Sequence, residues 1–250
     1  MDFFKLGKIG AKAHWLQYHK PVRKHISKNY SLLKKEKARL IGFIMGDGSI
    51  DRLKYPINPA NQHYDISFYP DSLEVAKIFI ADFKKLYLKE PIIRQRNNYY
   101  SLRVSSKPAC DDLRSFGEYT SLKWKFPNKL KTKEEKIEWL KAIFDCESCV
   151  GKKNIQFQSV SKIGIESIKK LLEELGILSN IYKYARKNKR WNDNYILIIS
   201  RKENIKRYAE LIGFNHPVKQ QKLTKLAGVP ERLMGESRKL VSARTPRFES

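Results

Sequence analysis

The chain has 250 residues, and its 51 Lys and Arg residues against 26 Asp and Glu residues leave a formal net charge of +25 at pH 7. A hydrophobic content of 41% with 12% aromatic residues excludes a disordered polyelectrolyte, so we expect a folded protein whose partner is a polyanion. No apolar run approaches the ~18 residues of a membrane span, and the N-terminus lacks the apolar core of a secretory signal, so we expect no membrane contact.

The first part of the chain is predicted to hold a basic extension and one folded half. Residues 1–36 are basic and aromatic, and two interpretations stay open: an arm that contacts nucleic acid, or an extension that packs on the fold. Residues 37–126 form the first half. Their spacing predicts a helix ending at Asp47, an irregular loop after Gly48 through Pro56, Pro59 and Asn61, a strand at 66–68, a helix at 73–87, a hairpin of strands at 92–96 and 100–105, and a short helix ending near 116–117.

The second part repeats this order after a short linker. Residues 127–136 are the predicted linker, and Thr132 with Glu135 forms a capping box that opens the next helix. Residues 137–225 form the second half, and residues 226–250 a basic tail. The predicted elements of this half are a helix ending at Glu147, a strand at 155–157, a helix at 163–175, a hairpin of strands at 181–184 and 195–200, and a helix ending at 212–213. Each half therefore reads α-β-β-α-β-β-α, which predicts an α+β fold.

Two nine-residue segments, 40–48 and 140–148, read as copies of one another at the end of each opening helix. Each carries small residues four positions apart: Gly42 and Gly46 in the first copy, Ala142 and Cys146 in the second. Small residues at this spacing lie on one helix face and let a second helix approach closely. We therefore expect the two helices to pack against each other.

A carboxylate stands at the eighth position of each copy, Asp47 in the first and Glu147 in the second. At a helix C-terminal end the macrodipole disfavours a carboxylate, and two such acids side by side repel. A divalent cation offsets both effects, and oxygen ligands suit Mg²⁺. Each copy alone fits an ordinary amphipathic helix that ends in a polar turn, but the matched pair favours a metal site.

These two motifs, with the element order around them, resemble the LAGLIDADG homing endonucleases over roughly residues 37–225. The resemblance implies two halves related by a pseudo-twofold axis, with the motif helices at the central interface and two antiparallel sheets forming a saddle over the DNA major groove. It also implies a monomer that cleaves a long, asymmetric double-stranded DNA site and leaves staggered ends.

The resemblance also implies roles for individual residues. Asp47 and Glu147 match the metal-binding acids, and the backbone carbonyls of Gly46 and Cys146 match auxiliary ligands of a divalent cation such as Mg²⁺. Lys219, in the run 216–220, is similar to a basic active-site residue of the family.

A further polar residue and two departures complete this comparison. Gln158 lies near a position where the family often has a polar side chain beside the nucleophilic water, whereas Tyr69, its partner in the first half, departs from that pattern. Met45 stands where the second copy has Asp145, and Ser148 replaces the final Gly. Neither change removes a metal-binding acid, so we expect activity.

The alternation of the predicted strands indicates which side chains face DNA. Leu102 and Val104 are expected to face the helices, which leaves Ser101, Arg103 and Ser105 on the other face. Because Arg reads guanine edges and Gln reads adenine edges, we expect base contacts on these outer faces. The expected base-reading and associated residues are Arg94, Arg96, Arg103, Ser105, Gln156 and Gln158, and the expected phosphate contacts are Lys183, Arg186, Lys187, Lys189 and Arg190.

The leading functional interpretation is a metal-dependent, site-specific DNA endonuclease encoded within an intron. The alternatives are an intron maturase that binds RNA and assists splicing, and a DNA-binding regulator that uses the same scaffold without chemistry. An intein is disfavoured, because the chain starts with Met and lacks a terminal His-Asn pair. Three cysteines fit a reducing compartment, and we expect either nucleoid-containing cytoplasm or a DNA-bearing organelle.

Overall fold

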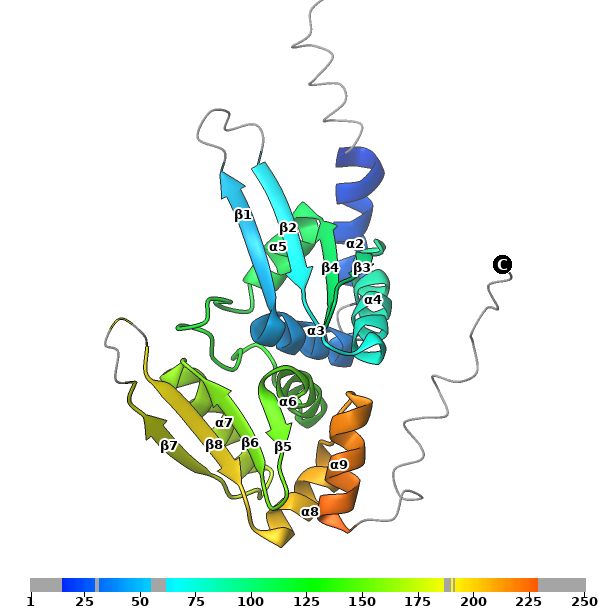
Figure 1. Cartoon of the computed structure of the whole chain (residues 1–250). Coiled ribbons are helices and arrows are strands. Elements are labelled where there is room, and N and C mark those ends of the chain that lie inside the picture. The colour runs from blue at the N-terminus through cyan, green and yellow to red at the C-terminus, as the bar shows by residue number, and fades with distance from the viewer. Residues whose placement is uncertain (1–14, 30–31, 55–61, 187–189, 191, 229–250) are drawn as a thin grey trace, which may run out of the picture.

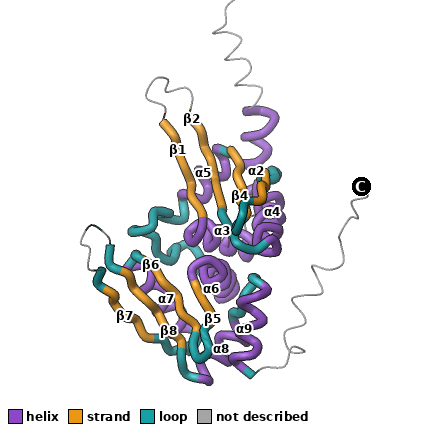
Figure 2. Tube along the Cα trace, viewed as in Figure 1, coloured by secondary structure: helices purple, strands orange, loops and turns teal. Residues whose placement is uncertain are grey.

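A computed structural model describes residues 15–29, 32–54, 62–186, 190 and 192–228 of the chain (Figure 1). Two similar halves meet at a pair of helices, α3 (Lys34–Asp47) and α6 (Lys133–Glu147), which contain the two motif copies. Each half adds one four-stranded sheet with helices behind it, so strands and helices form separate layers (Figure 2). The α+β prediction is confirmed.

The approach of α3 to α6 is as close as the small residues predict. A Cβ atom placed on Gly42 would lie 2.7 Å from the backbone oxygen of Trp139, and one on Gly46 would lie 2.5 Å from the Cβ of Cys146. No larger side chain fits at either position without moving a backbone. The expected central interface between the motif helices is therefore present.

The two sheets share one topology, as expected for an internal repeat. The first is ordered β1-β2-β4-β3 and the second β5-β6-β8-β7, and every pairing is antiparallel. The strands of the first sheet are β1 (Gly48–Lys54), β2 (Gln62–Phe68), β3 (Ile92–Gln95) and β4 (Tyr100–Ser105), and those of the second are β5 (Ser148–Val150), β6 (Ile155–Ser159), β7 (Asn180–Tyr184) and β8 (Asn194–Ile199).

The predicted faces of these strands are confirmed. Leu102 and Val104 are buried in the core, whereas Arg103 and Ser105 are exposed. Ile155 and Phe157 are likewise buried against the helices, so Gln156 and Gln158 point outward. One prediction is wrong, because residues 48–54 form strand β1 rather than the start of an irregular loop. This segment is polar, and it is a strand because it pairs along the whole of β2.

Further helices pack behind the two sheets. They are α4 (Leu73–Tyr87) and α5 (Lys107–Arg114) in the first half, and α7 (Lys162–Glu174) and α8 (Lys202–Leu211) in the second. The capping box that opens α6 is present as predicted, with Thr132 accepting from the Glu135 amide and the Glu135 side chain accepting from the Thr132 amide. Within the described residues, no helix combines the length and apolar character that a membrane crossing demands.

Both ends of the described chain are helical. A π-helical turn (Trp15–His19) leads into α2 (Lys20–Asn29), and this segment packs on the first half through Tyr18, which is hydrogen-bonded to Ser106 at 3.0 Å. At the other end, α9 (Pro217–Ala227) is a helix that is not among the predicted elements. His216 caps its N-terminus, and Gly228 ends it in the left-handed conformation.

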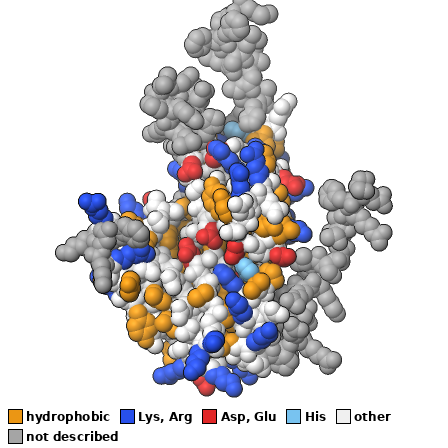
Figure 3. Space-filling view, viewed as in Figure 1, with side chains coloured by type: hydrophobic (Ala, Val, Ile, Leu, Met, Phe, Trp, Pro, Cys, Tyr) orange, Lys and Arg blue, Asp and Glu red, His pale blue; other side chains and the backbone are white. Residues whose placement is uncertain are grey.

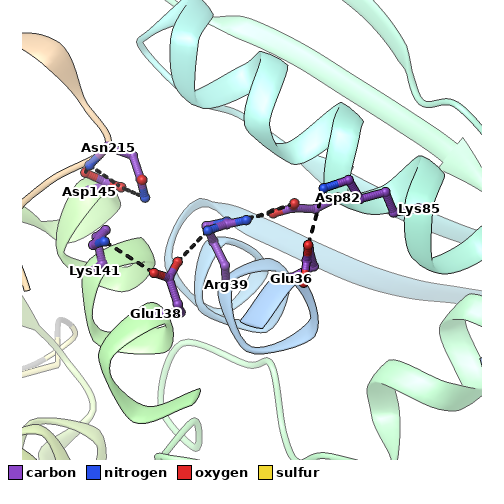
Figure 4. A network of polar contacts seen from close by, with 8 residues as sticks. All are labelled: Glu36, Arg39, Asp82, Lys85, Glu138, Lys141, Asp145 and Asn215. Atoms are coloured by element: carbon purple, nitrogen blue, oxygen red, sulfur yellow. Dashed lines mark hydrogen bonds and ion pairs between the residues drawn. The ribbon is translucent and has the colours of Figure 1, made fainter. Parts of the chain in front are cut away.

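A network of buried and partly buried charges joins the halves beside the central helices (Figure 4). Arg39 on α3 donates two hydrogen bonds to Asp82 on α4, at 2.7 and 3.0 Å, and a third to Glu138 on α6. Lys141 contacts the other oxygen of Glu138 at 3.3 Å. Burial raises the pKa of Asp82 to about 6, although Arg39 opposes this shift. The guanidinium therefore holds two acids of different halves together.

We expect Arg39→Met to destabilise the protein by about 3–5 kcal/mol at pH 8, because it leaves Asp82 and Glu138 as buried charges with one partner fewer. The loss is expected to shrink at pH 5, where Asp82 can take up a proton. The control is Lys84→Met, which breaks an exposed pair with Glu90 and is expected to cost less than ~1 kcal/mol. Urea unfolding at both pH values measures this, and equal losses in the two variants would contradict the role of the network.

Candidate functional site

Asp47 and Glu147 end the two central helices, and the next residue of each chain segment begins a strand. Gly48 follows Asp47 in an extended conformation. Glycine is needed there because a Cβ would lie 2.7 Å from Ile44 Cα and 2.8 Å from the Ser67 carbonyl oxygen. In the second half Ser148 takes this place, and its hydroxyl donates to the Phe144 carbonyl.

Both acids have raised pKa values, and the charge of Asp47 acts on Glu147. Burial raises the pKa of Glu147 to about 7, and the nearby negative charge of Asp47 contributes to the shift. Burial also raises the pKa of Asp47, with a smaller contribution from Asp71. Two partly buried carboxylates with raised pKa values form a site that favours added positive charge.

Lys219 supplies one positive charge at this site. It lies in the first turn of α9, and its ammonium donates to the backbone carbonyls of Asp145 and, at 3.4 Å, of Cys146. Its charge lowers the pKa of both Asp47 and Glu147, against the stronger effect of burial. The structure therefore brings Lys219 to the two acids, and it also occupies the Cys146 carbonyl that the resemblance suggests as a metal ligand.

Sequence analysis missed the residues that place Lys219. The buried carboxylate of Asp145 accepts from the backbone amides of Asn215 and His216, each at 3.0 Å, and from the Asn215 side chain at 2.8 Å. Asp71 of the first half reaches His216 from the other side, at 3.3 Å. One feature of the sequence points to these contacts: Asp145 stands in the second motif copy where the first copy has Met45.

A cavity of about 470 Å³ opens beside Glu147 on the side of the second sheet. Gln158 and Arg186 line it, so Gln158 lies in the same cavity as Glu147. The side-chain amide of Asn194 on β8 donates to the side-chain oxygen Oε1 of Gln158 at 3.3 Å. This hydrogen bond orients the Gln158 side chain. The cavity also contains Gly46, whose carbonyl is the other suggested auxiliary ligand.

The donor set fits a hard divalent cation. Within the described ranges, no group of three or more His, Cys, Asp and Glu side chains forms a complete metal site. Mg²⁺ commonly uses one or two protein carboxylates and completes its shell with water and substrate phosphates. Asp47 and Glu147 match that requirement, and their mutual repulsion is the penalty that a cation would remove.

The outer face of the first sheet carries most of the predicted base-reading residues. Arg94, Arg96, Arg103 and Ser105 line one groove of about 510 Å³. Arg103 and Ser105 both donate to Asp65, an acid that sequence analysis did not single out. Lys89, which also lines the groove, donates to the Ser105 carbonyl at 2.6 Å.

The predicted residues of the second sheet are more dispersed. Gln156 lies on the outer face of β6, where its side chain donates to Asn154 at 3.2 Å. Lys183 pairs in register with Tyr195, whose ring packs toward the core, so Lys183 lies on the helix side of the edge strand. It is bound to Asp193 at 2.7 Å, and Asp193 also accepts a hydrogen bond from the backbone of Arg186. Arg190 is exposed, and Lys187 and Lys189 lie outside the described residues.

We expect Glu147→Gln to stabilise the metal-free protein at pH 8. Because the folded state raises the pKa of Glu147 from 4.5 to about 7, stability falls as the pH rises through this window. Above it, the wild-type protein carries a penalty on the order of 1–3 kcal/mol that the amide lacks. Thermal unfolding in EDTA at pH 8 and pH 4 measures the difference, which is expected to be small at pH 4.

The matched control is Glu210→Gln, which removes an exposed acid paired with Lys206 at 3.9 Å. It is expected to change stability by less than ~0.5 kcal/mol at either pH. A Glu147→Gln protein no more stable than this control at pH 8 would show that the acid is not strained in the folded state.

Comparison with known proteins finds similarities that agree with this geometry. Residues 134–213 match the model of a LAGLIDADG-like domain. The chain is 29% identical over 197 residues to the glutamine–fructose-6-phosphate aminotransferase [isomerizing] of Methanocaldococcus jannaschii, a match that covers 75% of this chain and 17% of that protein. It is 28% identical over 197 residues to the replication factor C small subunit of Thermococcus kodakarensis, covering 77% of this chain and 21% of that protein. The chain thus spans about a fifth or less of the length of these relatives.

A relative of similar length is homing endonuclease I-DmoI of Desulfurococcus mucosus, which is 25% identical over 180 residues, covering 68% of this chain and 83% of that protein. The crystal structure of I-DmoI in complex with DNA and Ca superposes with a TM-score of 0.61 at 23% identity, covering 77% of this chain and 98% of that one. The family model and the shared fold together confirm that the chain resembles the LAGLIDADG family, as its two motifs indicate.

Proposed function

We propose that the protein is a site-specific endonuclease of double-stranded DNA, which hydrolyses phosphodiester bonds at a long, asymmetric site and leaves staggered ends. The observation that carries the proposal is the pair of carboxylates at the adjoining ends of α3 and α6, beside Lys219. The relationship to I-DmoI, a homing endonuclease solved in complex with DNA, supports the same activity.

Asp47 and Glu147 would hold the divalent cation, together with the carbonyl of Gly46, a residue that lines the same cavity as Glu147. Bound Mg²⁺ supplies a Lewis acid that polarises the phosphate and favours ionisation of a coordinated water. The chain adds the Lys219 ammonium, which lies close enough to both acids to lower their pKa values and can neutralise charge developing on the phosphate. Gln158, held by Asn194, can orient a water on the side of the second sheet.

The charge distribution supports DNA as the partner. A net charge of +25 attracts a polyanion, and each acid lies where its helix runs directly into the first strand of a sheet, α3 into β1 and α6 into β5 (Figure 1). A two-stranded ribbon or sheet fits the major groove of B-form DNA, whereas that of A-form RNA is too deep and narrow. Intron RNA is therefore the less favoured partner.

We expect Asp47→Asn and Glu147→Gln each to abolish double-strand cleavage and to keep DNA binding. Each change removes a cation ligand and leaves the Lys and Arg contacts with phosphate in place. Cleavage and gel-shift assays on the joined exons that flank the coding frame measure both effects, with Glu210→Gln as the control that keeps both activities. Cleavage at the wild-type rate by either variant would refute the site, and splicing assisted by the double variant would favour the maturase alternative.

We also expect the protein to be a monomer alone and on DNA. The two halves already supply both sides of the α3–α6 interface, so a second copy has no vacant place in it. Light scattering at micromolar concentration measures the mass, and an obligate dimer would contradict this arrangement.

A further inference from the structure

The outer faces of the two sheets differ in chemistry, although the sheets share one topology. Residues that pair across an antiparallel sheet point to the same face, so the register identifies the outward side chains. In the first sheet one outward row runs Ser49, Ser67, Arg103 and Ile92, and the next runs Asp51, Asp65 and Ser105. Arg94 lies opposite Ser101 in a third row. This face holds both positive and negative side chains.

The second sheet has no charged side chain in the corresponding rows of its described strands. Its outward residues are Cys149, Gln156, Ile198 and Asn180 in one row, Gln158, Ile196 and Tyr182 in the next, and Asn194 and Tyr184 in a third. Tyr182 is 55% exposed and Tyr184 62% exposed. Ile196 and Ile198, at the centre of the face, are only partly covered.

Positive charge lies at the two ends of this neutral face. Lys152 and Lys153 are exposed in the turn between β5 and β6, and Arg186 and Arg190 lie beyond the other end of the strands. Figure 3 shows the same pattern, with hydrophobic side chains over β7 and β8 and basic ones toward the ends of the sheet. A neutral strip bounded by cations matches a DNA groove, in which base edges lie between two rows of phosphates.

We propose that the two halves read DNA of different composition: the first sheet a half-site rich in G·C pairs, the second a half-site rich in A·T pairs. This inference rests on the proposed function and names its substrate more closely. It predicts that the two halves of the target differ in base composition, and that the A·T-rich half contacts the sheet β5–β8.

Direct readout chemistry supports the first assignment. Arg donates two hydrogen bonds to the O6 and N7 of guanine, and Asp accepts from the N4 of cytosine. Arg103 is bound to Asp65, so its guanidinium is held in place on the sheet before DNA arrives. Arg94 and Arg96 line the same groove. The first face thus presents arginine donors for guanine edges, and Asp51, which is exposed in the same groove, as an acceptor for cytosine.

Apolar contact and amide chemistry support the second assignment. Ile196 and Ile198 can cover the C5-methyl group of thymine, and Gln156 can bond the N6 and N7 of adenine. A G·C pair placed on the two isoleucines would lose hydration at polar edges without gaining partners there. The same surface that favours thymine therefore disfavours G·C.

The alternative occupant of this face is another protein, since exposed apolar surface also serves protein contacts. Continuity argues against it, because the face adjoins the acids through Gln158, which lines the cavity beside Glu147. A protein covering β7 and β8 would block access of DNA to that side of the site. We therefore commit to DNA, and a protein partner is an outcome that the test can reveal.

The first experiment selects DNA with the full-length protein. Duplexes with a randomised central segment are captured at ~0.2 M salt in EDTA, so that phosphate contacts are weakened and bound DNA stays intact. We expect an enriched site with one G·C-rich and one A·T-rich half. Selection with Arg103→Ala is expected to relax bases in the first half alone, and selection with Ile196→Ser to relax bases in the second half alone.

The second experiment removes the methyl group of thymine by placing uracil in the selected duplex. A contacted methyl is expected to be worth about a fourfold change in affinity. Uracil is expected to lower affinity in the A·T-rich half only. In the Ile196→Ala variant, this loss of affinity is expected to vanish at the thymine whose methyl group Ile196 contacts. Uracil in the other half is the matched control, which should leave affinity unchanged.

The outcomes separate this inference from the function on which it rests. An enriched site of even composition, or one insensitive to uracil, would overturn the inference while leaving a sequence-specific DNA-binding protein. If no duplex is enriched, both fail. If Ile196→Ser leaves base preference unchanged but alters the mass of the protein in solution, the second face is a protein interface and the inference is wrong.

Discussion

The close approach of α3 to α6 is the contact on which the rest of the structure depends. Gly42 and Gly46 leave no room for a side chain against Trp139 and Cys146, so the two helix backbones lie against each other. Both helices end at this contact, and each end carries an acid. The repeat that duplicates a helix and its acid therefore produces one site, because the packing of the helices brings the duplicated ends together.

This arrangement places two repelling carboxylates at the site, and ion pairs and hydrogen bonds around the site offset their unfavourable energy. The pKa of Glu147 is raised to about 7 by burial and by Asp47, so the metal-free site favours a proton. Lys219 opposes this from α9, whose N-terminus is held by Asp145. Arg39 joins the halves a short distance away through Asp82 and Glu138. The scaffold is tied together around two acids that repel, as expected for a site that binds cations.

Much of the architecture follows from patterns visible in the sequence. Small residues four apart predict the helix pair, and alternation in 100–105 and 155–159 predicts the outer faces, because both patterns have a fixed geometric period. Strand β1 was not predicted, since its residues are polar and its pairing with β2 is a tertiary effect. The Arg103–Asp65 pair and the anchor of Asp145 on residues 215–216 join positions far apart in sequence, and no local pattern encodes them.

The central claim is that Asp47 and Glu147 form one electrostatic unit. Titration of the carboxylates by ¹³C NMR, in the metal-free protein and in Asp47→Asn, tests it most directly. The account predicts that Glu147 titrates near pH 7 in the wild-type protein and that its pKa falls in the variant, while staying above 4.5 because the residue remains buried. A Glu147 pKa that is ordinary in the wild-type protein, or unchanged when Asp47 is neutralised, would contradict the account.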